Sequence, residues 1–135
     1  MKREFIFLSV FFYVFVYSQN MKLSISFSGM KNDKGNLMLA FFNSKDTFLK
    51  KENFGKVLKI TNKRASISID LPNGEYAFAC FHDVNNNKKM DKNILGIPTE
   101  RYAFSNNAKG FMSAPTYEKA KFFLDKDLKI DINLN

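Results

Sequence analysis

The residues best suited to chemistry lie in one short stretch, where oxygen-bearing side chains recur at alternate positions. Counting Asp83 as position 1 of a calcium loop gives Asn85 at 3, Asn87 at 5, the Lys89 carbonyl at 7 and Asp91 at 9. Oxygens at this spacing wrap a hard cation such as Ca²⁺. The spacing therefore predicts a calcium-binding loop.

Two departures from the calcium pattern make this predicted site weak. Position 12, where a bidentate glutamate is expected, holds Ile94, so Glu100 would have to fold back as the last ligand. Lys88 stands where such loops carry glycine, and its charge opposes a cation. We expect a Ca²⁺ dissociation constant of about 10⁻⁴–10⁻³ M, as in extracellular modules. The alternative is an Asn/Asp-rich turn whose side chains hydrogen-bond their own backbone.

His82, immediately before this loop, is the other candidate reactive group. It is the only histidine, which excludes a multi-histidine zinc or copper site. A hydrolase using His82 with Asp83 or Glu100 is the enzymatic alternative, because an imidazole near a carboxylate can transfer protons. Neighbours in a strand point to opposite faces, however, so His82 and Asp83 are poorly placed as a dyad. Cys80, the only cysteine, lies among apolar residues as a small buried hydrophobe does, and we expect no catalytic set.

Aromatic and amide side chains form a second candidate site, a ligand surface. Rings stack on the apolar faces of sugars and amides bond hydroxyl or peptide groups, so the partner would be a saccharide or peptide of the cell envelope. The alternative, which we favour, is that Tyr102 and Phe104 pin the loop to the domain, because large aromatic side chains are usually buried. The candidate surface comprises His82, Tyr102, Phe104, Asn106, Asn107 and Lys109.

A period of two dominates the hydrophobic pattern and predicts an all-β domain. Seven short strands with turns between them favour an antiparallel β-sandwich, with one long irregular loop from Asp83 to about Glu118. The predicted strands are Leu23–Ser28, Leu37–Phe42, Lys56–Ile60, Ala65–Leu71, Glu75–His82, Ala120–Leu124 and Lys129–Leu134. The predicted core residues are Leu23, Ile25, Phe27, Leu39, Phe41, Ile67, Ile69, Phe78, Cys80, Phe122 and Ile130.

Residues 1–18 have the pattern of a signal peptide, which leaves a single domain over residues 19–135. Lys2 and Arg3 precede an apolar run from Phe5 to Tyr17. The run is shorter than the roughly 20 residues of a spanning helix, so we expect no membrane span after cleavage and a periplasmic or secreted location. The formal charge of +8 comes from scattered lysines, so nucleic acid is not an expected partner.

Several short motifs in a fixed order resemble a known family. Leu71 to Tyr76 reads LPNGEY, Phe81 to Asp83 reads FHD, Leu95 to Glu100 reads LGIPTE, and Tyr102 to Ala108 continues the order. The chain thereby resembles the secreted bacterial family called domain of unknown function 2141, over nearly all of its length after the predicted signal peptide. The resemblance implies export and a sandwich of the immunoglobulin-like or transthyretin-like group, and it brings no established activity.

The family's loops often carry glycine where Asn86 and Lys88 stand here. Asparagine tolerates the left-handed backbone well, whereas lysine adopts it at a cost of about 1–2 kcal/mol.

The sequence as a whole predicts an exported, non-enzymatic β-sandwich, which is a binding or envelope-associated module with a weak structural Ca²⁺ loop. Two alternatives stay open. One is the hydrolase built on His82, and the other is a purely structural, self-associating envelope protein.

Overall fold

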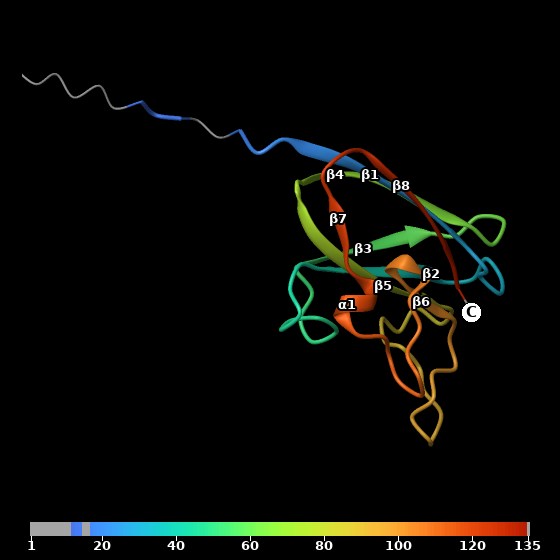
Figure 1. The fold of residues 1–135 in the computed structure, drawn as a ribbon. Coiled ribbons are helices and arrows are strands. Elements are labelled where there is room, and N and C mark those ends of the chain that lie inside the picture. The colour runs from blue at the N-terminus through green and yellow to red at the C-terminus, as the bar shows by residue number, and fades with distance from the viewer. Residues whose placement is uncertain (1–11, 15–16, 135) are drawn as a thin grey trace, which may run out of the picture.

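Two β-sheets form the domain in the computed structural model, which describes residues 12–14 and 17–134 (Figure 1). One sheet has three strands in the order β4-β1-β8, and the other has five, in the order β3-β2-β5-β6 with β7 also paired to β5. The prediction of an all-β fold is confirmed. The elements are β1 (Asn20–Ser28), β2 (Asn36–Phe42), β3 (Phe54–Lys59), β4 (Ala65–Pro72), β5 (Gly74–Asp83), β6 (Tyr102–Phe104), η1 (Ser105–Asn107), α1 (Tyr117–Ala120), β7 (Phe122–Leu124) and β8 (Leu128–Asn133).

An apolar core fills the space between the two sheets. Alternation along β1 turns Phe27 inward, where its ring meets that of Phe78 from β5 at 6.1 Å between centroids. Phe41 from β2 packs beside Phe78 at 5.6 Å. The predicted core residues that are buried are Leu23, Ile25, Phe27, Leu39, Phe41, Phe78 and Cys80.

The other four predicted core residues pack against this core but are only partly buried. Ile67 and Ile69 belong to β4 and Ile130 to β8, the two edges of the three-stranded sheet. Phe122 lies in β7, which pairs with β5 alone. A strand with a neighbour on one side leaves its inward side chains open to solvent along the other side.

The prediction of a purely antiparallel sandwich was wrong at one pair of strands. β8 runs parallel to β1, from Leu23 opposite Leu128 to Ser28 opposite Asn133. Parallel neighbours need a long crossover connection. The whole chain between β1 and β8 serves as this crossover connection, so β8 can lie parallel to β1.

The stretch predicted as one irregular loop, Asp83 to about Glu118, contains three short elements. β6 pairs with β5 at Ala79–Phe81, so the described residues form eight strands rather than seven. η1 and α1 follow, and the predicted strand Ala120–Leu124 is therefore helical at its first residue and extended only from Phe122. Three-residue strands carry too little alternation to be recognised in a sequence.

The predicted signal peptide, residues 1–18, lies largely outside the described residues. Those that are described before β1 have no regular structure and lead away from the sheets (Figure 1). Within the ranges 12–14 and 17–134, we find no helix with the length and apolar character needed to cross a membrane.

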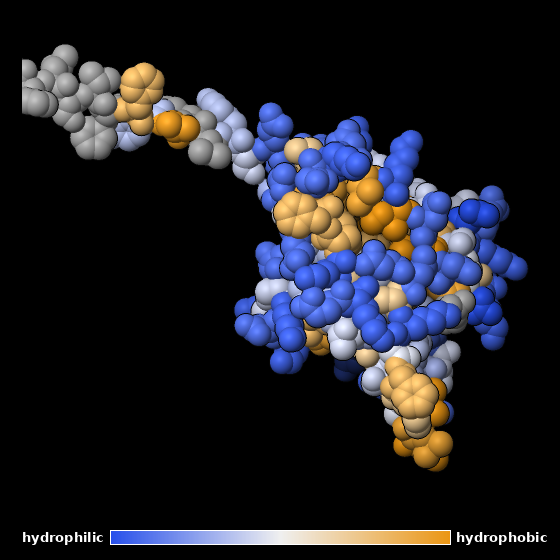
Figure 2. Space-filling model, in the orientation of Figure 1, coloured by the Kyte–Doolittle hydropathy of each residue, from blue (hydrophilic) through white to orange (hydrophobic). Residues whose placement is uncertain are grey.

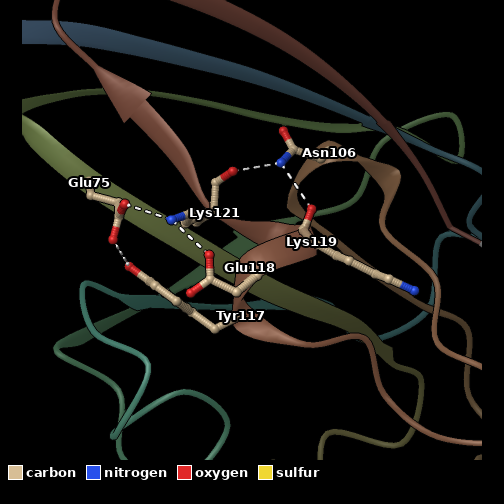
Figure 3. Close-up of polar contacts among 6 residues, drawn as sticks. All are labelled: Glu75, Asn106, Tyr117, Glu118, Lys119 and Lys121. Carbon is tan, nitrogen blue, oxygen red and sulfur yellow. Dashed lines mark hydrogen bonds and ion pairs between the residues drawn. The ribbon is translucent and has the colours of Figure 1, made fainter.

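A polar cluster fastens α1 to the start of β5 (Figure 3). The Tyr117 hydroxyl donates to Glu75 Oε2 at 3.0 Å, and Lys121 Nζ lies 3.4 Å from Glu75 Oε1 and 2.8 Å from Glu118 Oε2. Burial, and then the bond to Glu75, raise the pKa of Tyr117 to about 12. The bond to Lys121 lowers the pKa of Glu118. This cluster holds the helix against one end of the outer face of the five-stranded sheet.

Candidate functional site

The Asp83–Asp91 loop is folded around its own hydrogen bonds. Asp83, at the end of β5, is 1% exposed, and its two carboxylate oxygens accept the backbone N–H groups of Asn87 at 3.2 Å and Lys88 at 2.8 Å. Asn85 Oδ1 accepts the N–H of Asn87 at 3.3 Å, and Asn87 Oδ1 accepts that of Lys89 at 2.9 Å. Asn85 and Asn87 thus each hold the backbone two residues ahead, and Asp83 holds it four and five residues ahead.

Two more carboxylates close this loop. Asp91 accepts the side-chain amides of Asn85 and Asn87, both at 2.7 Å. Glu100 folds back and accepts the N–H groups of Val84 at 3.2 Å and Asp91 at 3.1 Å. The structure therefore brings together all the side chains predicted for the calcium site.

The backbone of the loop is left-handed at two positions. Asn86 has φ of 57° and Lys88 has φ of 61°. These are the positions at which the resemblance implied glycine. The bond from the Lys88 N–H to the buried Asp83 carboxylate supports the conformation that lysine alone disfavours.

Whether the loop suits Ca²⁺ depends on how many of its oxygen atoms remain free to coordinate an ion. Each carboxylate oxygen of Asp83, Asp91 and Glu100 accepts one N–H, which leaves each a further lone pair. The amides of Asn85 and Asn87 turn nitrogen toward Asp91, while a Ca²⁺ ion needs six to eight oxygens. Among the described residues, no group of three or more His, Cys, Asp or Glu side chains is arranged to hold a metal. Calcium binding stays a prediction, and the hydrogen-bonded turn accounts for the loop as it stands.

His82 lies on the inner side of β5 and is 1% exposed. Its Nε2 donates to the backbone carbonyl of Lys34 at 2.6 Å. The hydrolase alternative would require this ring to be uncovered. Cys80, two residues earlier on the same face, is also buried, and burial raises the pKa of its thiol to about 12. A protonated thiol is a poor nucleophile.

The two amides of the candidate ligand surface bond the protein itself. Asn106 Nδ2 donates to the carbonyls of Lys119 at 3.1 Å and Lys121 at 2.7 Å (Figure 3). Asn107 donates to the carbonyl of Asp131 at 3.1 Å and accepts the N–H of Asn133 at 3.1 Å. These bonds tie η1 to the segments around α1 and β8.

The two aromatic residues of that surface differ in exposure. Phe104 is buried against Phe48, with ring centroids 6.5 Å apart, so it pins β6 to the segment that follows β2. Tyr102 is partly exposed beside it, with ring centroids 5.9 Å apart. Both rings, together with Asn107 and Lys109, line a hollow of about 160 Å³. The usual ligand pocket is larger, roughly 300–1,000 Å³.

A larger groove, which sequence reasoning missed, crosses the outer face of the five-stranded sheet. Its volume is about 1230 Å³. Gly55 of β3, Ala40 of β2 and Ala79 of β5 lie in register across three strands. These three residues are the smallest of the outward-facing strand residues in the lining, and they form the floor of the groove.

Larger apolar residues form the walls of this groove. On one side, the next outward position of each strand holds a large side chain, with Val57, Met38, Phe81 and Tyr102 in register across four strands. On the other side, Phe42 follows Ala40 along β2. Loop residues complete the lining, among them Leu49, Leu95, Ile97 and Met112.

The charged residues that line the groove are mostly cationic. Lys50, Lys88 and Lys92 lie on bordering loops, and Glu52 is the one acid among the lining residues. Within the described chain none of these lysines forms an ion pair. The sequence gives one signal for the groove, because both faces of the strand Glu75–His82 are apolar. That signal does not reveal that one of the two faces stays partly open to solvent.

The model of one protein family matches the chain over residues 25–131, and its description is "uncharacterized protein conserved in bacteria". Comparison with curated proteins and with solved structures gives no significant match. The matched residues span β1 to β8 and include the calcium-like loop and the groove. The chain therefore belongs to this bacterial family, domain of unknown function 2141.

Proposed function

We propose that the protein is a binding module whose groove takes an elongated apolar molecule with an anionic group, such as a fatty acid. The observation that carries this proposal is the row Gly55, Ala40 and Ala79, which lies between a row of large apolar side chains on one side and Phe42 on the other. Rows at successive outward positions lie about 7 Å apart along a strand. A trench one row wide suits a single extended chain.

The lining favours an acyl chain over a saccharide or a peptide. The floor and the strand walls carry no side-chain amide or carboxylate that could bond sugar hydroxyls or peptide groups. Burying such groups without partners is costly. Asn106 and Asn107, the candidate residues for binding them, bond the protein backbone. The three bordering lysines complement an anionic head group.

A fluorescent fatty acid, cis-parinaric acid, tests the proposal by direct titration. Ala79→Leu places a larger side chain on the groove floor and should weaken binding at least about tenfold, because the leucine occupies the space of the chain. Ser66→Leu adds the same side chain to an exposed position of β4 in the other sheet and should leave binding unchanged. Equal affinity of Ala79→Leu and the unchanged protein would reject the groove as the binding site. Saccharide and peptide arrays on the same proteins test the two partners that the sequence suggested.

We also propose that the chain is exported to the periplasm or beyond, is not an enzyme, and has a sandwich of the immunoglobulin-like or transthyretin-like group. Support for export comes from the pattern of residues 1–18, and support for a binding role comes from the enclosed positions of His82 and Cys80. Fractionation of expressing cells, with mass spectrometry of the mature N-terminus, tests export and cleavage before Gln19. An uncleaved protein in the cytoplasm would contradict it.

A further inference from the structure

Two turns at one end of the molecule each display a pair of exposed apolar side chains. Ile94 and Leu95 are 103% and 77% exposed, and Phe111 and Met112 are 89% and 92% exposed. The segments that carry them project together from the sheets in Figure 1, and Figure 2 shows hydrophobic surface at the end of the projection. Leu95 and Met112 both line the groove, so the two turns border the same hollow.

The first turn is held in shape by Asn93. Its Oδ1 accepts the N–H groups of Leu95 at 2.9 Å and Ile97 at 3.0 Å, and its own N–H donates to the carbonyl of Ile97 at 2.9 Å. The N–H of Gly96 donates to the carbonyl of Asn93 at 2.9 Å. Ile94 and Leu95 are therefore fixed at the apex of the turn.

The second turn depends on Gly110. A Cβ atom there would lie 2.1 Å from the carbonyl oxygen of Ser113 and 2.6 Å from that of Ala114, so only glycine allows this close return of the chain. The Ser113 hydroxyl donates to the carbonyl of Phe111 at 3.2 Å, and Met112 has φ of 53°. Phe111 and Met112 are displayed at this apex as Ile94 and Leu95 are at the other.

Four lysines lie in the two segments that carry these apolar tips. Lys88, Lys89, Lys92 and Lys109 are all exposed in the two segments. Residues 84–98 and 106–116 contain a single acid, Asp91, and both of its carboxylate oxygens accept side-chain amides. The projecting end of the molecule is therefore apolar at its tips and positively charged behind them.

We propose that the two turns insert their tips into an anionic lipid surface, with the lysines against the head groups. Apolar side chains held beyond a set of lysines match the order of hydrocarbon and anionic head groups in such a surface. A second copy of the chain would bring one set of lysines against another, which disfavours a dimer through this end. The inference stands on the turns and their lysines, and it holds whether or not the groove takes an acyl chain.

Co-sedimentation with vesicles tests the inference. Protein processed by the expressing cell is mixed with vesicles of phosphatidylcholine containing 30% phosphatidylglycerol, a fraction chosen as roughly that of an anionic membrane, or with pure phosphatidylcholine. We expect binding to the anionic vesicles that weakens in high salt. Changing Ile94, Leu95, Phe111 and Met112 together to serine should weaken it at least about tenfold. Lys89→Glu with Lys109→Glu should also weaken it at least about tenfold at low salt.

Matched controls separate the tips from hydrophobicity and charge in general. Phe123→Ser removes an exposed apolar residue of β7, and Lys126→Glu with Lys129→Glu reverses two charges near the β7–β8 turn. Both should bind vesicles like the unchanged protein, and all variants share the same N-terminus.

Equal binding by the tip variant, with its melting temperature retained, would overturn the proposal. Oligomers that the tip changes dissociate, without vesicle binding, would overturn it in favour of self-association. Ala79→Leu should keep vesicle binding even if it loses parinaric acid, so the two proposals fail separately.

Discussion

The two faces of the five-stranded sheet carry apolar residues from the same strands but differ in how deeply these residues are buried. On the inner face, Leu39, Phe41 and Phe78 are buried beneath the other sheet. On the outer face, Ala40 and Ala79 are only partly buried and form the groove floor. An apolar strand face thus becomes core or an open groove according to what covers it, which the strand's own sequence does not determine.

The outer face itself is divided in two. At the end nearest the start of β5, Phe48, Tyr117 and Ala120 cover Phe42 and Ala77 in a second apolar cluster. No described element covers the other end in the same way, and the groove lies there. The polar cluster around Glu75 holds α1 over the covered part.

The largest expected effect tests the difference between the faces directly. Phe78→Ala removes a fully buried ring that meets Phe27, Phe41 and Phe122, and should cost about 3–5 kcal/mol in the free energy of unfolding. Phe81→Ala removes a half-buried ring from the wall of the groove and should cost about 1 kcal/mol. Urea denaturation measures both. Similar costs for the two variants would show that the outer face is core as well.

The second effect concerns the thiol of Cys80 on the inner face. The folded state raises its pKa from 9.0 to about 12, so this group's stabilising contribution is complete below pH 9 and is lost as the pH rises toward 12. The loss amounts to roughly 4 kcal/mol by pH 12, at about 1.4 kcal/mol per pH unit. Cys80→Ala should therefore show a shallower fall in unfolding free energy over this range, measured by urea denaturation at several pH values. Parallel curves for the two proteins would contradict the assignment.

Moving the thiol by one residue gives the matched control. In the double variant Cys80→Ala, Ala79→Cys, the thiol faces the groove on the outer side of β5. It should react readily with iodoacetamide in the folded protein at pH 8, whereas the native Cys80 should react only on unfolding.

The third effect concerns Ser105, the residue that joins β5 to α1. Ser105 is fully buried, and its hydroxyl accepts the N–H of Phe78 at 3.0 Å and lies 2.5 Å from the carbonyl of Ala120, to which it donates. Ser105→Ala leaves a buried N–H without its partner and should cost about 1–3 kcal/mol. Ser66→Ala, at an exposed position, should change the unfolding free energy by less than about 0.5 kcal/mol. If Ser105→Ala were equally mild, α1 and η1 would not depend on this bridge.

Much of the fold could be predicted because long strands alternate clearly. Every predicted strand has a counterpart with ends shifted by three residues at most, and Phe78 is buried as expected. β6 and α1 were not predicted, because segments of three and four residues carry no usable period. The parallel pairing of β8 with β1 depends on the path of the chain between them, which local patterns do not encode.

The candidate site was predictable only where its residues are close in sequence. The side chains from Asp83 to Asp91 fold together, and Glu100 joins them from nine residues beyond Asp91. The groove floor combines Gly55, Ala40 and Ala79 from three strands, and only the register between those strands places them in one row. Small residues scattered along a chain give no signal until that register is known.

The smallest expected effect is the stabilisation by Ca²⁺ of the loop that begins at Asp83. The side chain of Asp83 comes next after the outward-facing residues of β5, yet it is as buried as the residues of the inner face. If the loop binds Ca²⁺ with a dissociation constant near 10⁻³ M, 10 mM Ca²⁺ should add about 1.4 kcal/mol to the unfolding free energy and raise the melting temperature. Mg²⁺ should do less because it demands a tighter octahedral shell.

Asp91→Asn keeps the size of the side chain but removes a charged ligand, so it should abolish the response to Ca²⁺. Asp46→Asn, in the loop after β2, should preserve it. An unchanged melting curve of the native protein would mean that hydrogen bonds alone hold the Asp83 carboxylate in place.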